Sequence, residues 1–136
     1  MAVPIPNDFR DLIDRPIVVA LVTVMPDGQP QATPVWVDYD GTYVIVSTAR
    51  GRQKDRNMKL GAKVTILSID PDDDGRWLEV RGVVAVETED GAVDVINKLS
   101  QKYRGDPDYY GADTERRNRE TRVTYKIEPL RVNVSG

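Results

Sequence analysis

A cation-rich segment stands between two apolar runs and decides the fold: Ser47-Thr48-Ala49-Arg50-Gly51-Arg52-Gln53-Lys54-Asp55-Arg56-Asn57-Met58-Lys59-Leu60-Gly61-Ala62-Lys63. The runs Tyr43–Val46 before it and Val64–Leu67 after it have the β-branched, apolar composition of strands. The segment holds six cations and one acid in a chain whose net charge is −3. We therefore expect a basic helix between two strands, with Thr48 as its N-cap and Gly61 as its C-terminal cap.

Two interpretations of this segment stay open. A helix start exposes unpaired backbone N–H groups and partial positive charge, which suits a phosphate held by Arg and Lys side chains. The alternative is a solvated basic helix face with Thr48 as an ordinary cap. In either case Arg50 and Lys59 are expected to be solvated, attracting an anion only from a distance.

Outward from this segment, turn residues separate further strand-like runs. The hairpin signals Pro26–Gln29 and Asp40–Gly41 predict antiparallel neighbours. Strands are expected at Ile17–Met25, Pro30–Tyr39, Thr42–Thr48, Val64–Ile69, Arg76–Glu87 and Arg122–Pro129, the last continuing through Val134. Helices are expected at Asn7–Ile13, Glu89–Arg104 and Thr114–Thr121.

This pattern predicts a mainly β fold, with six or seven antiparallel strands in a closed or nearly closed barrel and short flanking helices. The chain of 136 residues has no linker or repeat, so residues 1–136 are expected to form one domain. Two prolines within Pro30–Tyr39 indicate an edge position or a bulge, and Gly82 indicates a bulge or a close backbone approach.

Composition excludes several kinds of chemistry. The chain has neither cysteine nor histidine, which removes thiolate catalysis, serine–histidine hydrolysis and the usual zinc ligands. The acidic turn Asp70–Gly75 lacks the flanking helices and distal Glu of a calcium loop, so a solvated hairpin loop is the better interpretation and no metal site is expected. Chemistry must then come from carboxylates, Lys, Tyr or a bound cofactor.

The sequence also bears on location and partners. The N-terminal residues do not resemble a signal peptide and no apolar run is long enough to cross a bilayer, so we expect a cytoplasmic protein with no membrane partner. Nucleic acid is not expected, because the basic segment lacks the interleaved aromatic residues that stack on bases.

Several pieces of the chain, taken in order, resemble the pyridoxamine-phosphate-oxidase-like split barrels that bind flavin or deazaflavin, and in particular the F420-dependent oxidoreductases. The resemblance spans Val18–Val134. The pieces that carry it are Asp27–Pro30, Pro34–Trp36, Ser47–Thr48, the helix residues Arg52, Lys54, Arg56 and Asn57, Glu79–Gly82 and Tyr103–Tyr110.

The resemblance implies a split β-barrel that forms a homodimer with two cofactor sites at the subunit interface. Arg52 and Lys54 would hold the cofactor phosphate, with Gln53, Asn57 and the Ser47–Thr48 strand end nearby. The flat ring of the cofactor would lie along the strand segment Ala32–Trp36 and contact Ala32, Pro34, Val35 and Trp36. Trp77 of the partner subunit would cover the ring. Tyr109 and Tyr110 are weaker candidates for a substrate or cofactor rim.

Each of these residues has a structural alternative. Trp36 and Trp77 are equally suited to a core or a dimer interface. Lys54 can be a free surface lysine. Asn57 can tie the helix to a neighbouring strand by hydrogen bonds.

Three functions follow from the resemblance and the composition. The first is hydride transfer between coenzyme F420 and a small organic acceptor of the C=C or C=N type, with a proton from solvent or a tyrosine; no catalytic residue is assigned. The second keeps the fold and replaces F420 with FMN. The third is a non-catalytic protein that binds flavin or F420. The abundance of cations and the short chain favour F420.

Overall fold

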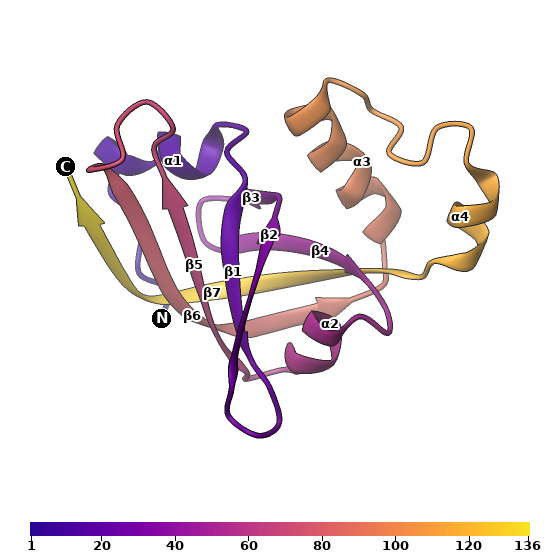
Figure 1. Ribbon diagram of the computed structural model, residues 1–136, viewed down its shortest axis with the longest axis horizontal. Coiled ribbons are helices and arrows are strands. Elements are labelled where there is room, and N and C mark those ends of the chain that lie inside the picture. Colours follow the sequence, from indigo (N-terminus) through magenta and orange to yellow (C-terminus); the bar gives the residue numbers. More distant parts are fainter.

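The computed structural model describes all residues, 1–136, and its main element is one antiparallel sheet of seven strands (Figure 1). The order of the strands across the sheet is β2-β1-β5-β6-β7-β4-β3. The predicted mainly β, antiparallel architecture is therefore confirmed. The seven strands are β1 Val19–Val24, β2 Pro30–Val35, β3 Val37–Tyr39, β4 Val44–Ala49, β5 Lys63–Ile69, β6 Trp77–Thr88 and β7 Arg122–Ser135.

The sheet curls because its two edge strands are neighbours in the chain. β2 and β3 stand at opposite ends of the strand order, yet only Trp36 separates them in sequence. The two edges must therefore meet at Trp36. They do not pair with each other, so the barrel stays split. The prediction of one strand over Pro30–Tyr39 is therefore wrong, because this segment forms two strands, β2 and β3. The predicted edge position of its prolines is confirmed, since both lie in the edge strand β2.

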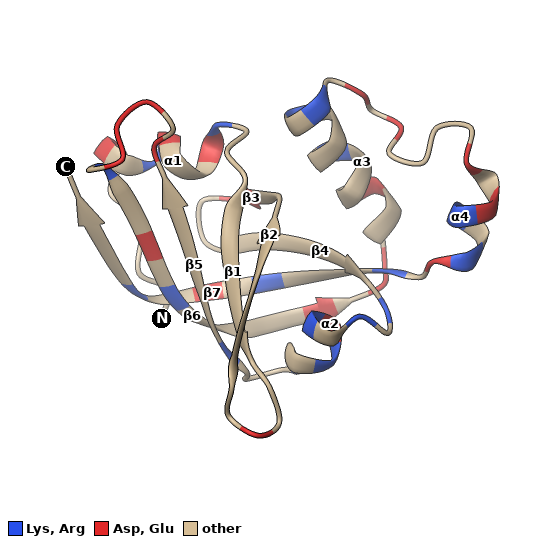
Figure 2. Cartoon of the chain, viewed as in Figure 1, with Lys and Arg blue, Asp and Glu red and all other residues tan.

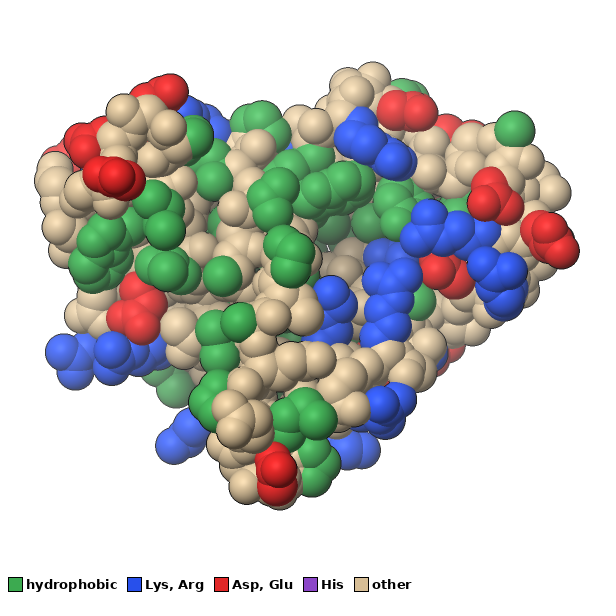
Figure 3. Space-filling view, viewed as in Figure 1, with side chains coloured by type: hydrophobic (Ala, Val, Ile, Leu, Met, Phe, Trp, Pro, Cys, Tyr) green, Lys and Arg blue, Asp and Glu red, His purple; other side chains and the backbone are tan.

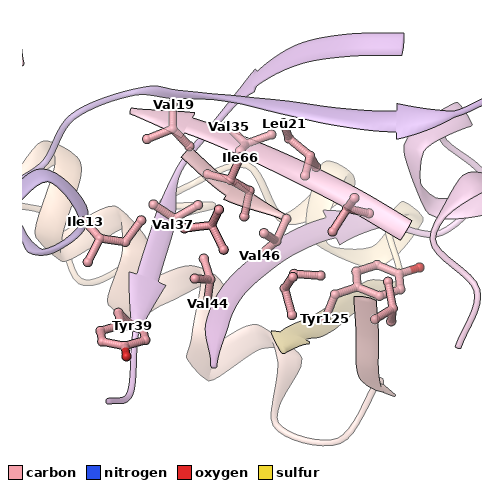
Figure 4. Close-up of a cluster of buried hydrophobic side chains, with 14 of the residues drawn as sticks. Ile13, Val19, Leu21, Val35, Val37, Tyr39, Val44, Val46, Ile66 and Tyr125 are labelled. Atoms are coloured by element: carbon pink, nitrogen blue, oxygen red, sulfur yellow. The ribbon is translucent and has the colours of Figure 1, made fainter. Parts of the chain in front are cut away.

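Alternating side chains from every strand fill the inside of this half-barrel. Tyr125, Leu21, Ile66, Val37 and Val46 are almost completely buried in one cluster of 19 residues (Figure 4). Period-2 alternation explains this, because successive side chains point to opposite faces of a strand. The short helix α1 (Asp11–Asp14), preceded by the 3-10 turn η1 (Asn7–Phe9), adds Leu12 and Ile13 to the cluster.

Three further helices lie outside the core: α2 (Gln53–Asn57), α3 (Ala92–Arg104) and α4 (Thr114–Arg119). The amphipathic helix α3 buries Ala92, Ile96 and Leu99 and contacts β7 and β4. Figure 1 shows α3 and α4 together beside the end of the sheet where β4 finishes and β7 begins. None of the helices combines the length and apolarity needed to span a bilayer.

The long basic helix expected over the cation-rich segment is wrong. Thr48 and Ala49 complete β4 by pairing with Val123 and Arg122 of β7, so Thr48 is a strand residue and caps nothing. Gly51 then turns the chain with φ +92°, and α2 runs only from Gln53 to Asn57. Its C-cap is Met58 and not Gly61. A helix of five residues leaves no substantial dipole for an anion.

The acidic turn Asp70–Gly75 joins β5 to β6, as the hairpin interpretation expects. It is less solvated than expected at one position. Asp70 is buried and forms ion pairs with Arg76 (3.0 Å) and Arg15 (3.5 Å), which tie the turn to the N-terminal helix. No group of three or more acidic side chains in the chain has the geometry to hold a metal ion.

Gly82 marks the predicted irregularity in β6. The β6–β7 register shifts between Arg81 and Gly82, and a Cβ built on Gly82 would lie 2.2 Å from the Glu128 carbonyl oxygen. That prediction is confirmed in both of its forms, the bulge and the close backbone approach. The longest pair of strands thus depends on a position where a side chain does not fit.

We predict that Gly82→Ala lowers the free energy of unfolding by about 2 kcal/mol or more, because the new methyl group meets backbone that cannot move aside cheaply. Gly75→Ala is the matched control, since its Cβ would have only an ordinary contact of 3.4 Å with Asp73. Urea denaturation measures both variants. Equal stability of the two variants would contradict the assigned packing at Gly82.

Candidate cofactor site

A cleft of about 330 Å³ opens between the split edge of the sheet and α3. Figure 2 shows that Lys and Arg gather on α2, at the start of β7 and on α4, the elements around this region. In the space-filling view the basic side chains border a hollow whose other side is apolar (Figure 3). The cleft is lined by Val18, Pro34, Val35, Trp36, Ser47, Arg52, Lys54, Ile96, Leu99, Tyr109 and Arg122.

The basic side of the cleft is built from three cations on two elements. Arg52 and Lys54 come from the turn and helix after β4, and Arg122 begins β7. Lys54 is half-buried, and this burial, followed by the charges of Arg52 and Arg122, lowers its pKa. No acidic group offsets this effect on Lys54. Three like charges held this close favour an anion between them.

Arg122 is the most deeply buried of the three, with a side chain only 3% exposed. The β4–β7 register brings it beside Ser47, whose Oγ accepts a hydrogen bond from Arg122 Nη2 at 2.9 Å. The remaining donors, Nε and Nη1, are buried and hydrogen-bond to no protein group. Since buried guanidinium donors are normally satisfied, these two nitrogens point to a ligand acceptor in the cleft.

One carboxylate balances part of this charge. Glu120 accepts hydrogen bonds from Arg52 Nη2 at 3.2 Å and from the Tyr110 hydroxyl at 2.9 Å, and it lies 3.5 Å from Arg122 Nη1. Burial raises the pKa of Glu120, but hydrogen bonds from Tyr110 and Arg116 outweigh this and bring it below its usual value. Glu120 is therefore charged at neutral pH.

The other side of the cleft is aromatic and apolar. Trp36, at the junction of β2 and β3, stacks on Tyr103 of α3 with ring centroids 5.2 Å apart and an interplanar angle of 12°. Tyr109 meets the Trp36 ring edge-on at 6.0 Å. The Tyr103 hydroxyl accepts from Val37 N–H (3.1 Å) and donates to the Ile17 carbonyl (2.8 Å). These hydrogen bonds hold the Tyr103 ring on which Trp36 stacks.

Comparisons with known proteins fit this arrangement. The sequence profile described as pyridoxamine 5'-phosphate oxidase matches residues 5–135. The chain belongs to the pyridoxamine 5'-phosphate oxidase family. The expected resemblance is thus confirmed, and the family is one of flavin- and deazaflavin-binding oxidoreductase type. No curated protein matches the chain significantly.

Solved structures share this fold. One called F420 reductase is 32% identical, with a TM-score of 0.80, and the match covers 95% of this chain and 98% of that chain. Rv2991 from Mycobacterium tuberculosis is 23% identical, with a TM-score of 0.76, over 98% of this chain and 86% of its own. PhzG from Burkholderia lata 383, solved with tetrahydrophenazine-1-carboxylic acid, is 18% identical, with a TM-score of 0.61. The match covers 88% of this chain and 69% of PhzG. These last two likenesses show the fold alone.

In this member of the pyridoxamine 5'-phosphate oxidase family, six of the eleven residues expected from the sequence line the cleft together: Pro34, Val35, Trp36, Ser47, Arg52 and Lys54. Ala32 lines an adjoining groove on the outer face of β1, β2 and β5. Thr48 is buried and lies on the opposite face of β4 from Ser47, since neighbouring residues alternate.

Gln53 and Asn57 stand apart from the cleft. Gln53 Nε2 donates to Asn57 Oδ1 at 2.8 Å, and Asn57 Nδ2 donates to Thr23 Oγ1 at 3.0 Å. Asn57 therefore ties α2 to β1, as its structural alternative proposes. Trp77 is also remote and lines an outer groove with Leu67, Ile69 and Glu79.

Arg50 is not a free, solvated cation, because it forms ion pairs with three carboxylates, and this corrects the expectation for it. Its guanidinium donates to Asp55 (3.0 Å), Glu89 (2.9 Å) and Glu87. Asp55 in turn accepts from the Gly51 N–H at 2.9 Å and from the buried Tyr125 hydroxyl. Although burial raises the pKa of Asp55, the bonds from Tyr125, Gly51 and Arg50 lower it overall. Arg50 and Asp55 thus fix the turn after β4.

Sequence reasoning missed the α3 residues Ile96 and Leu99, Val18, and above all Arg122. Tyr109 lines the cleft as its weaker candidacy suggested, whereas Tyr110 is buried and bonds to Glu120. The local pattern gave no signal for Arg122, because it stands in phase with the polar positions Thr124 and Lys126 of its strand-like run. Its partner Ser47 is 75 residues away in sequence.

We predict that Arg50→Ala lowers the free energy of unfolding by about 2 kcal/mol, because it leaves the carboxylates of Asp55 and Glu87 without their cation. Lys59→Ala, which removes a cation from the same segment, is the control and should change stability by less than about 0.5 kcal/mol. Urea denaturation monitored by tryptophan fluorescence measures both. A fully stable Arg50→Ala protein would contradict the scaffold role.

Proposed function

We propose that this protein is an oxidoreductase that transfers a hydride between coenzyme F420 and a small organic acceptor of the C=C or C=N type. The observation that carries the proposal is the presence of two buried Arg122 nitrogens, Nε and Nη1, that have no hydrogen-bond partner and lie at the basic end of a cleft with an aromatic wall. Such a site suits a flat molecule with an anionic end. The similarity to F420 reductase supports the choice of deazaflavin.

The residues present fit such a cofactor. Arg52, Lys54, Arg122 and the Ser47 hydroxyl would hold its phosphate, since Arg and Lys donors bind phosphate by charge-assisted hydrogen bonds. Pro34, Val35 and Trp36, facing Ile96 and Leu99 of α3, would hold its ring. When bound, the deazaflavin supplies two-electron hydride transfer, and the protein supplies binding, orientation and electrostatics.

A tyrosine is available near the reacting region. Tyr109 is the one tyrosine lining the cleft, and its hydroxyl accepts a hydrogen bond from Arg116 Nη2 at 2.8 Å. It would stand at the rim, beside the place for an acceptor. Solvent or this hydroxyl then provides the proton that a chain without histidine must find elsewhere.

FMN is the second candidate cofactor. The family match favours it, because the matching profile is that of pyridoxamine 5'-phosphate oxidase. The three cleft cations would suit its single phosphate equally well. A protein that binds either cofactor without turnover would use the same cleft, so retention of cofactor and turnover must be measured separately.

A homodimer completes the proposal. The cleft shares Val18 and Pro34 with an apolar groove, and this groove shares Leu67 and Ile69 with a third one that reaches Trp77. Val18 and Ile69 are 55% and 45% exposed. A continuous apolar strip of this kind is expected to be covered by a protein partner. A second copy of the chain would cover the strip and place its Trp77 against the cofactor ring.

To test the cofactor, purified protein is mixed with F420 or with FMN, desalted, and examined by fluorescence for retained cofactor. We expect F420 to be retained. Replacing Arg52 and Lys54 together with Ala should weaken binding by roughly 100-fold, since each lost phosphate contact costs about 1.5 kcal/mol.

The matched control for that double variant is Arg56→Ala with Lys59→Ala, which removes two cations of the same segment outside the cleft. Folding of both proteins should be intact by circular dichroism. Unchanged affinity for both cofactors in the Arg52/Lys54 variant would count against the phosphate site, and retention of neither by wild type would end the proposed function.

For the dimer, we predict that wild-type protein sediments with the mass of two chains and that Ile69→Glu sediments as one, because a buried carboxylate would oppose apolar contact. Leu60→Glu is the control, since Leu60 is 64% exposed and lies outside the three grooves. Analytical ultracentrifugation distinguishes the masses. A monomeric wild type would refute this arrangement.

A further inference from the structure

Glu120 holds an unusual position beside the anion end of the cleft. It is the C-cap residue of α4, two positions before the start of β7, and its side chain is only 14% exposed. One carboxylate oxygen accepts from Tyr110, and the other accepts from Arg52 and from Arg116, each at 3.2 Å. The chain therefore presents one fixed negative charge to cations that come from three different segments.

The charge of Arg122 makes this carboxylate necessary. Removing a guanidinium from water is strongly unfavourable unless a negative charge lies nearby. Glu120 is the one acid paired with Arg122, at 3.5 Å from Nη1, a distance that gives an ion pair without a hydrogen bond. Glu120 thus supplies charge balance but leaves Nε and Nη1 of Arg122 free to donate.

A bound anion would contact the same cations as Glu120 and would compete with this carboxylate in neutralising them. Arg52 and Arg122 face Glu120 on one side and the cleft on the other. A phosphate held by them would lie close enough to Glu120 to be repelled through a medium of low effective dielectric. The carboxylate therefore stabilises the protein when no anion is bound and opposes the anion when one arrives.

We propose that Glu120 is an internal stand-in for the ligand's anionic group and sets how strongly the site prefers a phosphorylated ligand over its phosphate-free parent. This inference rests on the proposed function, because it concerns the same anion end of the cleft. It makes a prediction that a purely structural role does not make: loss of the Glu120 charge lowers the stability of the ligand-free protein but raises its affinity for anions.

The test compares Glu120→Gln with wild type and with Glu115→Gln, which removes an exposed charge from the same helix without touching Arg52 or Arg122. Affinities for FMN and riboflavin, and for F420 and its phosphate-free deazaflavin, are measured by fluorescence titration. In Glu120→Gln the ratio of affinities, phosphorylated over phosphate-free, should rise by roughly tenfold. Its melting temperature without ligand should fall, and inorganic pyrophosphate should restore more of it than in wild type.

The outcomes separate this inference from the proposed function. If wild type prefers the phosphorylated ligands and Glu120→Gln leaves the ratio unchanged or lowers it, the inference is overturned while the cofactor site stands. If wild type retains no flavin or deazaflavin, the proposed function fails, and the pyrophosphate shift still decides the role of Glu120. If Glu120→Gln does not fold, Glu120→Asp replaces it in the test, because it keeps the charge but withdraws it from the cations by one methylene. An unchanged ratio of affinities, phosphorylated over phosphate-free, in Glu120→Asp also overturns the inference.

Discussion

The burial of one guanidinium at the start of β7 constrains everything around the cleft. Strand pairing places the backbone of Arg122, since Ala49↔Arg122 is the last pair of the β4–β7 ladder, and its side chain is only 3% exposed. A charge held this way must be balanced locally. Its guanidinium lies beside Ser47, Glu120, the Tyr109 ring (5.3 Å to the centroid) and the cleft, so strand pairing places a cation here that needs negative charge nearby.

The cations of the segment after β4 have two different roles, one in the scaffold and one in the cleft. Arg50 turns back to three carboxylates and closes the turn after β4, whereas Arg52 and Lys54 turn toward the cleft. Gly51 separates the two groups, and its positive φ reverses the chain between them. Asp55, the single acid of the segment, serves the scaffold, because Gly51, Arg50 and Tyr125 all donate to it. The local excess of cations is therefore partly structural and only partly available to a ligand.

The sequence predicted the strands well because turn residues and alternation are local signals. The family resemblance named Arg52, Lys54, Ser47 and the Pro34–Trp36 stretch as cofactor-binding residues, and the structure brings them together in one cleft. The sequence failed on the helix after β4, because Thr48 and Ala49 have a partner strand more than 70 residues away that no local pattern reveals. Arg122, Ile96 and Leu99 were missed for the same reason, since their place in the cleft arises only when β7 and α3 pack against β4. Asn57 shows the converse, because a polar residue at a promising spacing can be used entirely for hydrogen bonds within the fold.

The split in the barrel explains why the cleft lies where it does. If β2 and β3 paired, the sheet would close and side chains would fill the space at Trp36. They cannot pair, because the chain passes from one edge to the other through this single residue, and the edges must diverge on either side of it. The ring of Trp36 stacks on Tyr103 at this opening. The ring side of the site is thus a consequence of an unclosed sheet, and the anion side a consequence of a strand that begins with a buried charge. A flat, anionic molecule would satisfy both conditions at once, and under the proposed function it would supply the chemistry that a chain without histidine or cysteine lacks.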